Sequence, residues 1–241
     1  EYPHLVEVTD AQSRYGIKSP GECGANPCKQ WIVRITNEKT LSKSESSTKD
    51  NESQRPEVFF SGELHGNERV GPSTLVVFMK LLLESYSRKE NPNPWLKYLV
   101  DTRSIYIMPM TNALGYYQNR REEHNIDPNR DFPIDLSQSN LCMRTITARA
   151  VNELWREHLF QLAITFHGGM RAIAYEWGTV TERTHREKKS PDDVAQSALG
   201  SALSAFAGVG PEKHKRYPHN RINDVVYPVK GGMEDWAYAG S

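Results

Sequence analysis

The chain has 241 residues, of which 37% are apolar, 10% aromatic and 25% charged, proportions that are typical of a globular protein. No run reaches the roughly 18 apolar residues that a membrane-spanning helix requires, so the sequence predicts no membrane span. The 30 Lys and Arg residues balance the 30 Asp and Glu residues, and we therefore expect no nucleic-acid partner.

Short runs of β-branched and aromatic residues predict buried strands, and longer apolar patterns between them predict helices. The predicted elements are, in chain order, strand 31–35, strand 58–60, helix 72–87, strand 105–108, helix 145–159, strand 162–166, a further strand within 172–177 and helix 194–206. This alternation predicts an α/β fold with a mixed, largely parallel twisted sheet and helices on both faces. Residues 41–56 are almost entirely polar, so we expect a loop there that links two strands. Because we interpret this segment as a loop and not as a domain boundary, we expect a single domain over residues 1–241.

The three cysteines are too few for a disulfide scaffold. Cys23 and Cys28 lie in a segment whose Gly and Pro permit a bend that joins them, which would leave Cys142 as a free thiol. Three unpaired thiols are an equally open alternative.

A His-x-x-Glu pattern follows the predicted strand 58–60 and leads into the predicted helix 72–87. In open α/β sheets ligands bind at this edge of the strands, and His65 and Glu68 can direct an imidazole and a carboxylate at one Zn²⁺. His4 and Glu7 show the same spacing but follow no predicted strand, so we interpret them as surface residues.

A third ligand is expected from His167, the one other histidine that ends a predicted buried strand. Two Gly residues follow it and allow other groups to approach its imidazole closely. Two His and one Glu with an open fourth position form a catalytic zinc arrangement, whereas structural zinc is closed by four protein ligands. The alternative for His167 is a core side chain that is hydrogen-bonded to a backbone carbonyl.

Residues 119–133 form a long polar segment after the predicted strand 105–108, and such loops at a sheet edge often carry function. A guanidinium matches a carboxylate with two parallel hydrogen bonds, and an Arg beside a metal can stabilise an oxyanion. This chemistry makes candidates of Arg120, Arg121 and Arg130. The alternative is surface ion pairing with the neighbouring acids Glu122, Glu123 and Asp131.

Five segments, taken together, resemble the zinc metallocarboxypeptidase family, and they occur in the family's order between residues 58 and 241. They are His65-Gly-Asn-Glu68, Asn112-Ala-Leu-Gly115-Tyr, Asp127-Pro-Asn129-Arg130-Asp-Phe-Pro, Phe166-His167-Gly-Gly and Gly231-Gly-Met-Glu-Asp-Trp-Ala-Tyr238. The first and third forms are most similar to the branch that contains carboxypeptidases N and E.

The resemblance implies a role for each matching residue. The zinc ligands would be His65, Glu68 and His167, which hold one Zn²⁺ per chain. The terminal carboxylate of the substrate would bind Asn129 and Arg130, and Tyr238 would close over the bound residue. Arg120 would polarise the scissile carbonyl, and the adjacent Arg121 stays open for the same role. From the residues alone, Tyr238 is either a core aromatic or a mobile phenol donor.

The sequence also departs from the family's pattern. Asn112-Ala-Leu-Gly115 lacks the family's Pro and Asp, and Gly178 stands where the N and E branch places an acidic residue. A preference for basic C-terminal residues is therefore not implied. The family's general base is a Glu on a strand after the tyrosine, and no residue up to Ser241 fills this role, so we expect the chain to be truncated at its C-terminus.

The sequence thus predicts a zinc-dependent exopeptidase that hydrolyses the C-terminal peptide bond of peptides or proteins with a free C-terminus. The oligomeric state stays open, with a monomer as the expectation. One alternative is an inactive zinc-containing protein that binds C-terminal carboxylates, and another is a zinc deacylase of N-acyl amino acids. The possible Cys23–Cys28 pair, the glycosylation triplet that begins at Asn51 and the family branch lead us to expect a secreted protein.

Overall fold

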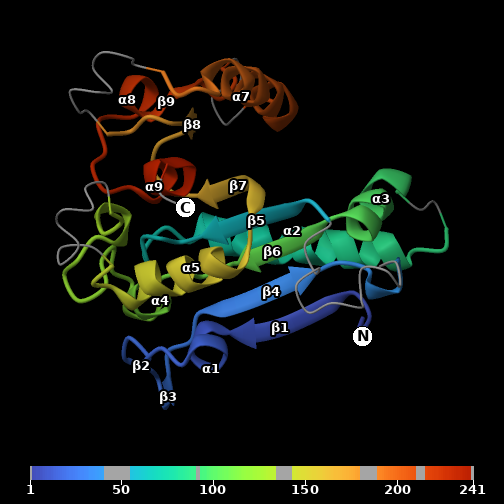
Figure 1. The fold of residues 1–241 in the computed structure, drawn as a ribbon, viewed down its shortest axis with the longest axis horizontal. Helices are drawn as coiled ribbons and strands as arrows, with labels where there is room; N and C mark the ends of the chain where they lie inside the picture. The colour runs from blue at the N-terminus through green and yellow to red at the C-terminus, as the bar shows by residue number, and fades with distance from the viewer. Residues whose placement is uncertain are drawn as a thin grey trace. The chain divides into compact units, whose positions relative to one another are not determined.

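The computed structural model describes residues 2–40, 55–90, 93–133, 143–179, 189–209 and 215–239 (Figure 1). Three features of the sequence lie outside these residues: most of the predicted loop 41–56, the triplet at Asn51 and the thiol of Cys142. The chain divides into two compact units. The first contains Glu1–Asn125 and Thr145–His167, and the second contains Ile126–Arg144 and Gly168–Ser241.

A five-stranded mixed sheet forms the centre of the first unit. Its strands are, in spatial order, β1 (Val6–Asp10), β4 (Trp31–Ile35), β6 (Ser104–Met108), β5 (Glu57–Gly62) and β7 (Phe160–Phe166). The β1–β4 and β4–β6 pairs are antiparallel, whereas β5 runs parallel to both β6 and β7. The mixed sheet is therefore confirmed, and four of its strands are the four that the sequence predicts within this unit.

Helices cover both faces of this sheet, as predicted. Phe59 and Phe60 are neighbours on β5, so their side chains point to opposite faces. Phe59 packs against Trp155 of α5 (Ile146–Glu157), with ring centroids 5.7 Å apart. Phe60 packs against Phe78 of α2 (Val70–Ser87), with centroids 5.2 Å apart. Figure 1 shows α5 and α2 on either side of the strands.

Several shorter elements complete the first unit. They are α1 (Ala11–Tyr15), β2 (Glu22–Cys23), β3 (Asn26–Pro27), the 3-10 turn η1 (Glu38–Thr40), α3 (Pro94–Thr102) and α4 (Ala113–Gln118). They are not among the predicted elements, because two to nine residues are too few for a clear hydrophobic period. Cys23 and Cys28 form a disulfide, which decides between the two alternatives for this pair.

The second unit contains a two-stranded parallel sheet, β8 (Ile173–Tyr175) with β9 (His219–Arg221). Its helical elements are η2 (Pro128–Arg130), α7 (Asp193–Ala207), α8 (Ile222–Val225) and α9 (Met233–Ala239). The predicted strand within 172–177 and helix 194–206 correspond to β8 and α7. Across the described parts of both units, no helix combines the length and the apolar character that crossing a membrane requires.

Candidate metal centre

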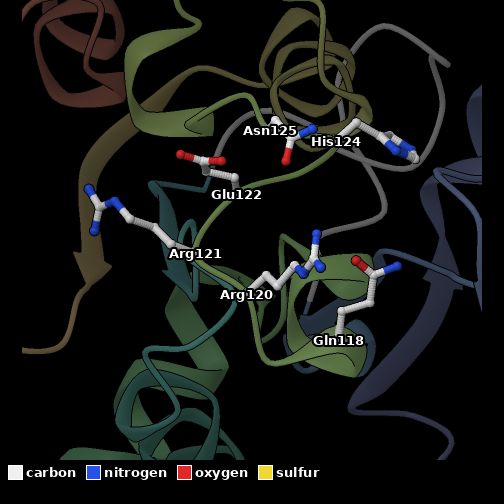
Figure 2. A pocket seen from close by; sticks show the side chains of 6 residues that line it. All are labelled: Gln118, Arg120, Arg121, Glu122, His124 and Asn125. Carbon is white, nitrogen blue, oxygen red and sulfur yellow. The ribbon is translucent and has the colours of Figure 1, made fainter.

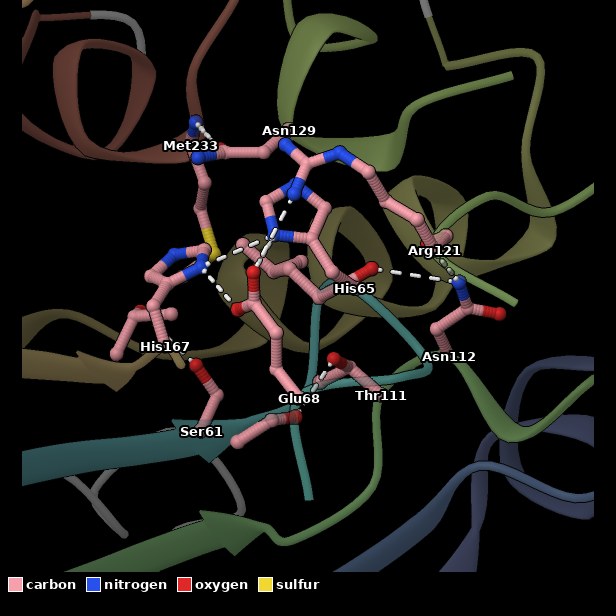
Figure 3. Close-up of polar contacts among 12 residues, drawn as sticks. Ser61, His65, Glu68, Thr111, Asn112, Arg121, Asn129, His167 and Met233 are labelled. Atoms are coloured by element: carbon pink, nitrogen blue, oxygen red, sulfur yellow. Dashed lines mark hydrogen bonds and ion pairs between the residues drawn. The ribbon is translucent and has the colours of Figure 1, made fainter. Parts of the chain in front are cut away.

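Three potential metal ligands converge at the carboxyl ends of β5 and β7. One ligand atom of each of His65, Glu68 and His167 lies within 4.8 Å of the others. The Nδ1 atom of His65 lies 2.9 Å from Glu68 Oε1, and the Nδ1 atom of His167 lies 3.0 Å from Glu68 Oε2. The two Nδ1 atoms are 3.3 Å apart. Figure 3 shows the carboxylate between the two imidazoles. The three side chains that the sequence predicts as ligands therefore lie together.

This donor set fits a zinc ion. Nitrogen and oxygen ligands of tetrahedral zinc lie about 2.0 to 2.2 Å from the metal, which places them about 3.3 Å from one another. The three closest distances between the ligand atoms here are 2.9, 3.0 and 3.3 Å. Two neutral imidazoles and one carboxylate also leave a fourth position open, which is the composition of a catalytic zinc site.

The parallel pairing of β5 with β7 brings these residues together. Ser61 pairs with Thr165 and Gly62 with Phe166, so the two strands end side by side and His167 follows directly. His65 lies in the loop after β5 and is 3% exposed. Gly66 permits this loop to lie against α4, because a Cβ on Gly66 would lie 2.1 Å from the carbonyl carbon of Gly115. No residue larger than Gly fits at this position.

Two consecutive arginines have different surroundings beside this centre. The Nη1 atom of Arg121 lies 3.3 Å from Glu68 Oε1, so its guanidinium forms an ion pair with a candidate ligand. Arg120 and Arg121 both line a hollow with Gln118, Glu122, His124 and Asn125, and their side chains point in different directions (Figure 2). Among the described residues, Arg121 contacts Glu68 and Arg120 does not. The sequence alone does not distinguish these two arginines.

Glu63, two residues before His65, is a buried carboxyl that the sequence analysis did not single out. It is fully buried, and neither of its carboxylate oxygens has a hydrogen-bond partner among the described residues. Burial raises the pKa of Glu63 to about 9, and the neighbouring charge of Glu68 also raises it. Glu63 is therefore uncharged at neutral pH, so it adds no second negative charge to that of Glu68.

Glu123 also has a role that the sequence analysis missed. The sequence suggests a surface partner for the arginines, but Glu123 is 2% exposed. Its carboxylate accepts hydrogen bonds from the backbone N–H of Ile146 and of Thr147, at 2.6 and 3.0 Å, and from the Thr147 hydroxyl at 2.7 Å. Glu123 thus caps the N-terminus of α5, where a negative charge is favourable. The sequence around Glu123 does not show that its side chain is buried, so this capping role could not be predicted.

In the second unit, Asn129 and Arg130 lie in η2 (Pro128–Arg130). The amide oxygen of Asn129 accepts a hydrogen bond from the Met233 N–H at 2.8 Å, and the Arg130 guanidinium donates to the Asn129 carbonyl at 2.6 Å. Gly231 has a φ of +78°, and a Cβ on it would lie 2.5 Å from the Arg130 carbonyl oxygen. The Gly-rich turn and the predicted carboxylate-binding pair therefore pack together.

Tyr238 lies in α9 of the same unit, and its hydroxyl donates a hydrogen bond to Asp192 Oδ2 at 3.0 Å. Its ring packs edge-on against Trp177, with centroids 5.3 Å apart. Burial and the bond to Asp192 raise the pKa of Tyr238, so the phenol remains protonated at neutral pH. Gly178 is buried, and its N–H donates to Asp235 at 2.8 Å.

Comparison with known proteins identifies relatives of the chain. A family model described as zinc carboxypeptidase matches residues 28–241. Carboxypeptidase M of Mus musculus is 31% identical over 202 residues, covering 76% of this chain and 44% of that protein. Carboxypeptidase D of Homo sapiens is 28% identical over 204 residues, covering 76% of this chain and 14% of that protein. The chain thus spans less than half the length of these curated relatives.

Solved structures show the same fold at lower identity. Bovine thrombin-activatable fibrinolysis inhibitor, solved with tick carboxypeptidase inhibitor, superposes with a TM-score of 0.68 at 18% identity, covering 98% of this chain and 76% of that chain. Carboxypeptidase A from Helicoverpa armigera gives a TM-score of 0.69 at 18% identity, covering 98% of this chain and 57% of that chain.

Proposed function

The chain belongs to the zinc carboxypeptidase family, and we propose that it is the zinc-binding part of an exopeptidase that removes C-terminal residues from peptides or proteins. The observation that carries this proposal is the convergence of His65, Glu68 and His167 at the end of two parallel strands. These residues would hold one zinc ion. When bound, the ion would polarise the scissile carbonyl and lower the pKa of a coordinated water towards about 7.

The arginines beside the ligands would supply positive charge to the reaction. A guanidinium stays protonated throughout the pH range of catalysis and can donate hydrogen bonds to an oxyanion as it forms. We propose Arg120 for this role on the resemblance to the family. The ion pair of Arg121 with Glu68 supports a separate role, in which Arg121 offsets the charge of that carboxylate.

Asn129 and Arg130 would restrict the enzyme to chain ends. A guanidinium and an amide donate several hydrogen bonds to a free carboxylate, and the main chain of a peptide offers one only at its last residue. The packing of Gly231 against the Arg130 backbone and the bond from Met233 to Asn129 hold this pair in place. Tyr238 would donate its phenol hydrogen to the bound residue after releasing Asp192.

We also propose that the protein passes through the secretory pathway. The disulfide between Cys23 and Cys28 supports this location, because disulfides persist in oxidising compartments and are rare in the cytosol.

Metal analysis of the purified chain tests whether the three candidate ligands bind zinc. We expect about one zinc per chain, which a chelator removes. Replacement His65→Ala should abolish binding because it removes a ligand. Replacement His4→Ala is the matched control, because His4 and Glu7 repeat the His-x-x-Glu spacing and lie apart from the three candidate ligands. Equal zinc content in both variants would contradict the site.

Hydrolysis is then assayed with the protein as its gene encodes it. A peptide with a free C-terminus should be cleaved, and the same peptide with a C-terminal amide should not. Replacement Arg130→Ala should raise KM sharply for the free peptide. Zinc binding without cleavage would identify a carboxylate-binding protein instead, and cleavage of N-acyl amino acids alone would identify a deacylase.

A further inference from the structure

Asn112 connects three segments that surround the candidate metal centre. It is fully buried, and it precedes α4 as that helix's N-cap. Its amide nitrogen lies 3.3 Å from the Leu64 carbonyl and 3.3 Å from the Arg121 carbonyl, and it donates to both (Figure 3). Its amide oxygen accepts from the Gly115 N–H at 2.9 Å. Both hydrogens of the amide group are thus used, and its oxygen is used as well.

The partners of Asn112 lie on either side of a candidate ligand. Leu64 precedes His65 in the chain and Gly66 follows it. The Gly66 N–H donates to the Arg121 carbonyl at 3.2 Å, which is the carbonyl that also accepts from Asn112. His65 is therefore held on its N-terminal side by the Leu64 carbonyl and on its C-terminal side by the Gly66 N–H, and both bonds belong to one network.

An Asn side chain suits this position for chemical reasons. It offers two donors and an acceptor on one short planar group. Asp has the same shape but no donor, so it would direct its oxygens at two carbonyls. Ser can cap a helix through its hydroxyl, but it has only one donor and a shorter side chain, so it cannot bind both carbonyls. The backbone of Asn112 adds a further tie, because its N–H donates to the Glu63 carbonyl at 3.0 Å.

We propose that Asn112 is a positioning residue of the metal centre, which sets the loop that carries His65 against the loop that carries Arg121. This inference rests on the proposed function only in that the centre binds zinc. Groups that orient a metal ligand from outside the coordination sphere commonly change metal affinity or activity by about 10- to 100-fold when they are removed.

The test compares Asn112→Ser with Asn93→Ser. Both Asn residues cap helices, since Asn93 accepts from the backbone N–H groups of Trp95 and Leu96 at the start of α3. The Ser variants keep a capping oxygen in each case. We expect zinc affinity, measured by chelator competition on the 241-residue chain, to fall about 10- to 100-fold in Asn112→Ser and to stay unchanged in Asn93→Ser.

Hydrogen exchange of the metal-free chain supplies a second measurement. In Asn112→Ser the Gly66 amide should exchange at least several-fold faster, because its acceptor is no longer fixed, whereas the capped Gly115 amide should remain protected. Unchanged zinc affinity in Asn112→Ser would overturn the proposal, even where the melting temperature falls or the Gly66 amide exchanges faster.

The two proposals fail in different ways. A wild-type chain that binds no zinc overturns the proposed function, and the exchange of Gly66 then decides whether Asn112 holds the loop. A wild-type chain that binds zinc as tightly as Asn112→Ser leaves the proposed function standing and overturns the positioning role.

Discussion

Single residues at the centre differ in how far the sequence reveals them. His65 and His167 stand at the ends of apolar runs, and parallel strands bring their ends to one edge, so their meeting was predictable. The partners of Arg121 and Glu123 were not predictable. Spacing along a loop does not say which way a side chain points, and the structure directs Arg121 to Glu68 and Glu123 to the end of α5.

The two arginines can be separated by their effects on rate and on metal affinity. In Arg120→Ala we expect kcat to fall about 100- to 1000-fold, the usual cost of removing an oxyanion donor. In Arg121→Ala we expect zinc affinity to rise a few-fold, because Glu68 loses a competing cation. Steady-state kinetics of the protein as encoded and chelator competition measure the two effects. The opposite pattern would transfer the oxyanion role to Arg121.

At the scale of elements, the sequence predicted the strands β4, β5, β6 and β7 of the sheet and the long helices. Buried parallel strands are near-continuous apolar runs, and β5 and β6 have this pattern. The strand β1 (Val6–Asp10) was missed because its sequence, VEVTD, alternates with polar residues and lies at the sheet edge. It pairs antiparallel with β4. The alternation of strands and helices along the chain predicts parallel pairs and therefore does not predict this one.

The stability of the first turn of α5 depends on Glu123, which lies 23 positions before Ile146 in the chain. Replacement Glu123→Ala should leave two backbone N–H groups without their acceptor, at a cost of about 2 kcal/mol or more in the free energy of unfolding. Urea denaturation measures this change. Glu122→Ala is the control, because Glu122 is exposed and adjacent. Equal stability of the two variants would refute the capping role.

At the scale of the whole molecule, the functional candidates are divided between two compact units. The candidate zinc ligands and both arginines of the hollow belong to the first, and Asn129, Arg130 and Tyr238 belong to the second. The prediction of a single domain over residues 1–241 stays a prediction. The resemblance to the family identifies these residues from the sequence alone, because a motif depends on the order of residues along the chain and not on their positions in space.

The pH dependence of stability should reflect Glu176 in the second unit. Burial, together with the charges of Asp235 and Glu234, raises the pKa of Glu176 to about 7 from an ordinary value of 4.5. The folded protein therefore holds a proton that the unfolded chain releases between these values, and stability falls as pH rises through this range.

Replacement Glu176→Gln removes this dependence and keeps an oxygen that accepts from Gln196. We expect the melting temperature of the variant, relative to wild type, to increase by about 3 °C or more between pH 5 and pH 8. Calorimetry at several pH values measures the difference. A constant difference across this range would show that Glu176 titrates normally.

The disulfide has a consequence for how the protein is produced. Cys28 packs with Ala113 and Leu114, and Cys23 lies against the same cluster, so the bridged hairpin supports the first turn of α4. That turn begins at Asn112. Glutathione in a bacterial cytosol keeps thiols reduced, so protein expressed there lacks the disulfide that supports this turn. Protein secreted to the periplasm can form the disulfide and is therefore the better material for zinc titrations.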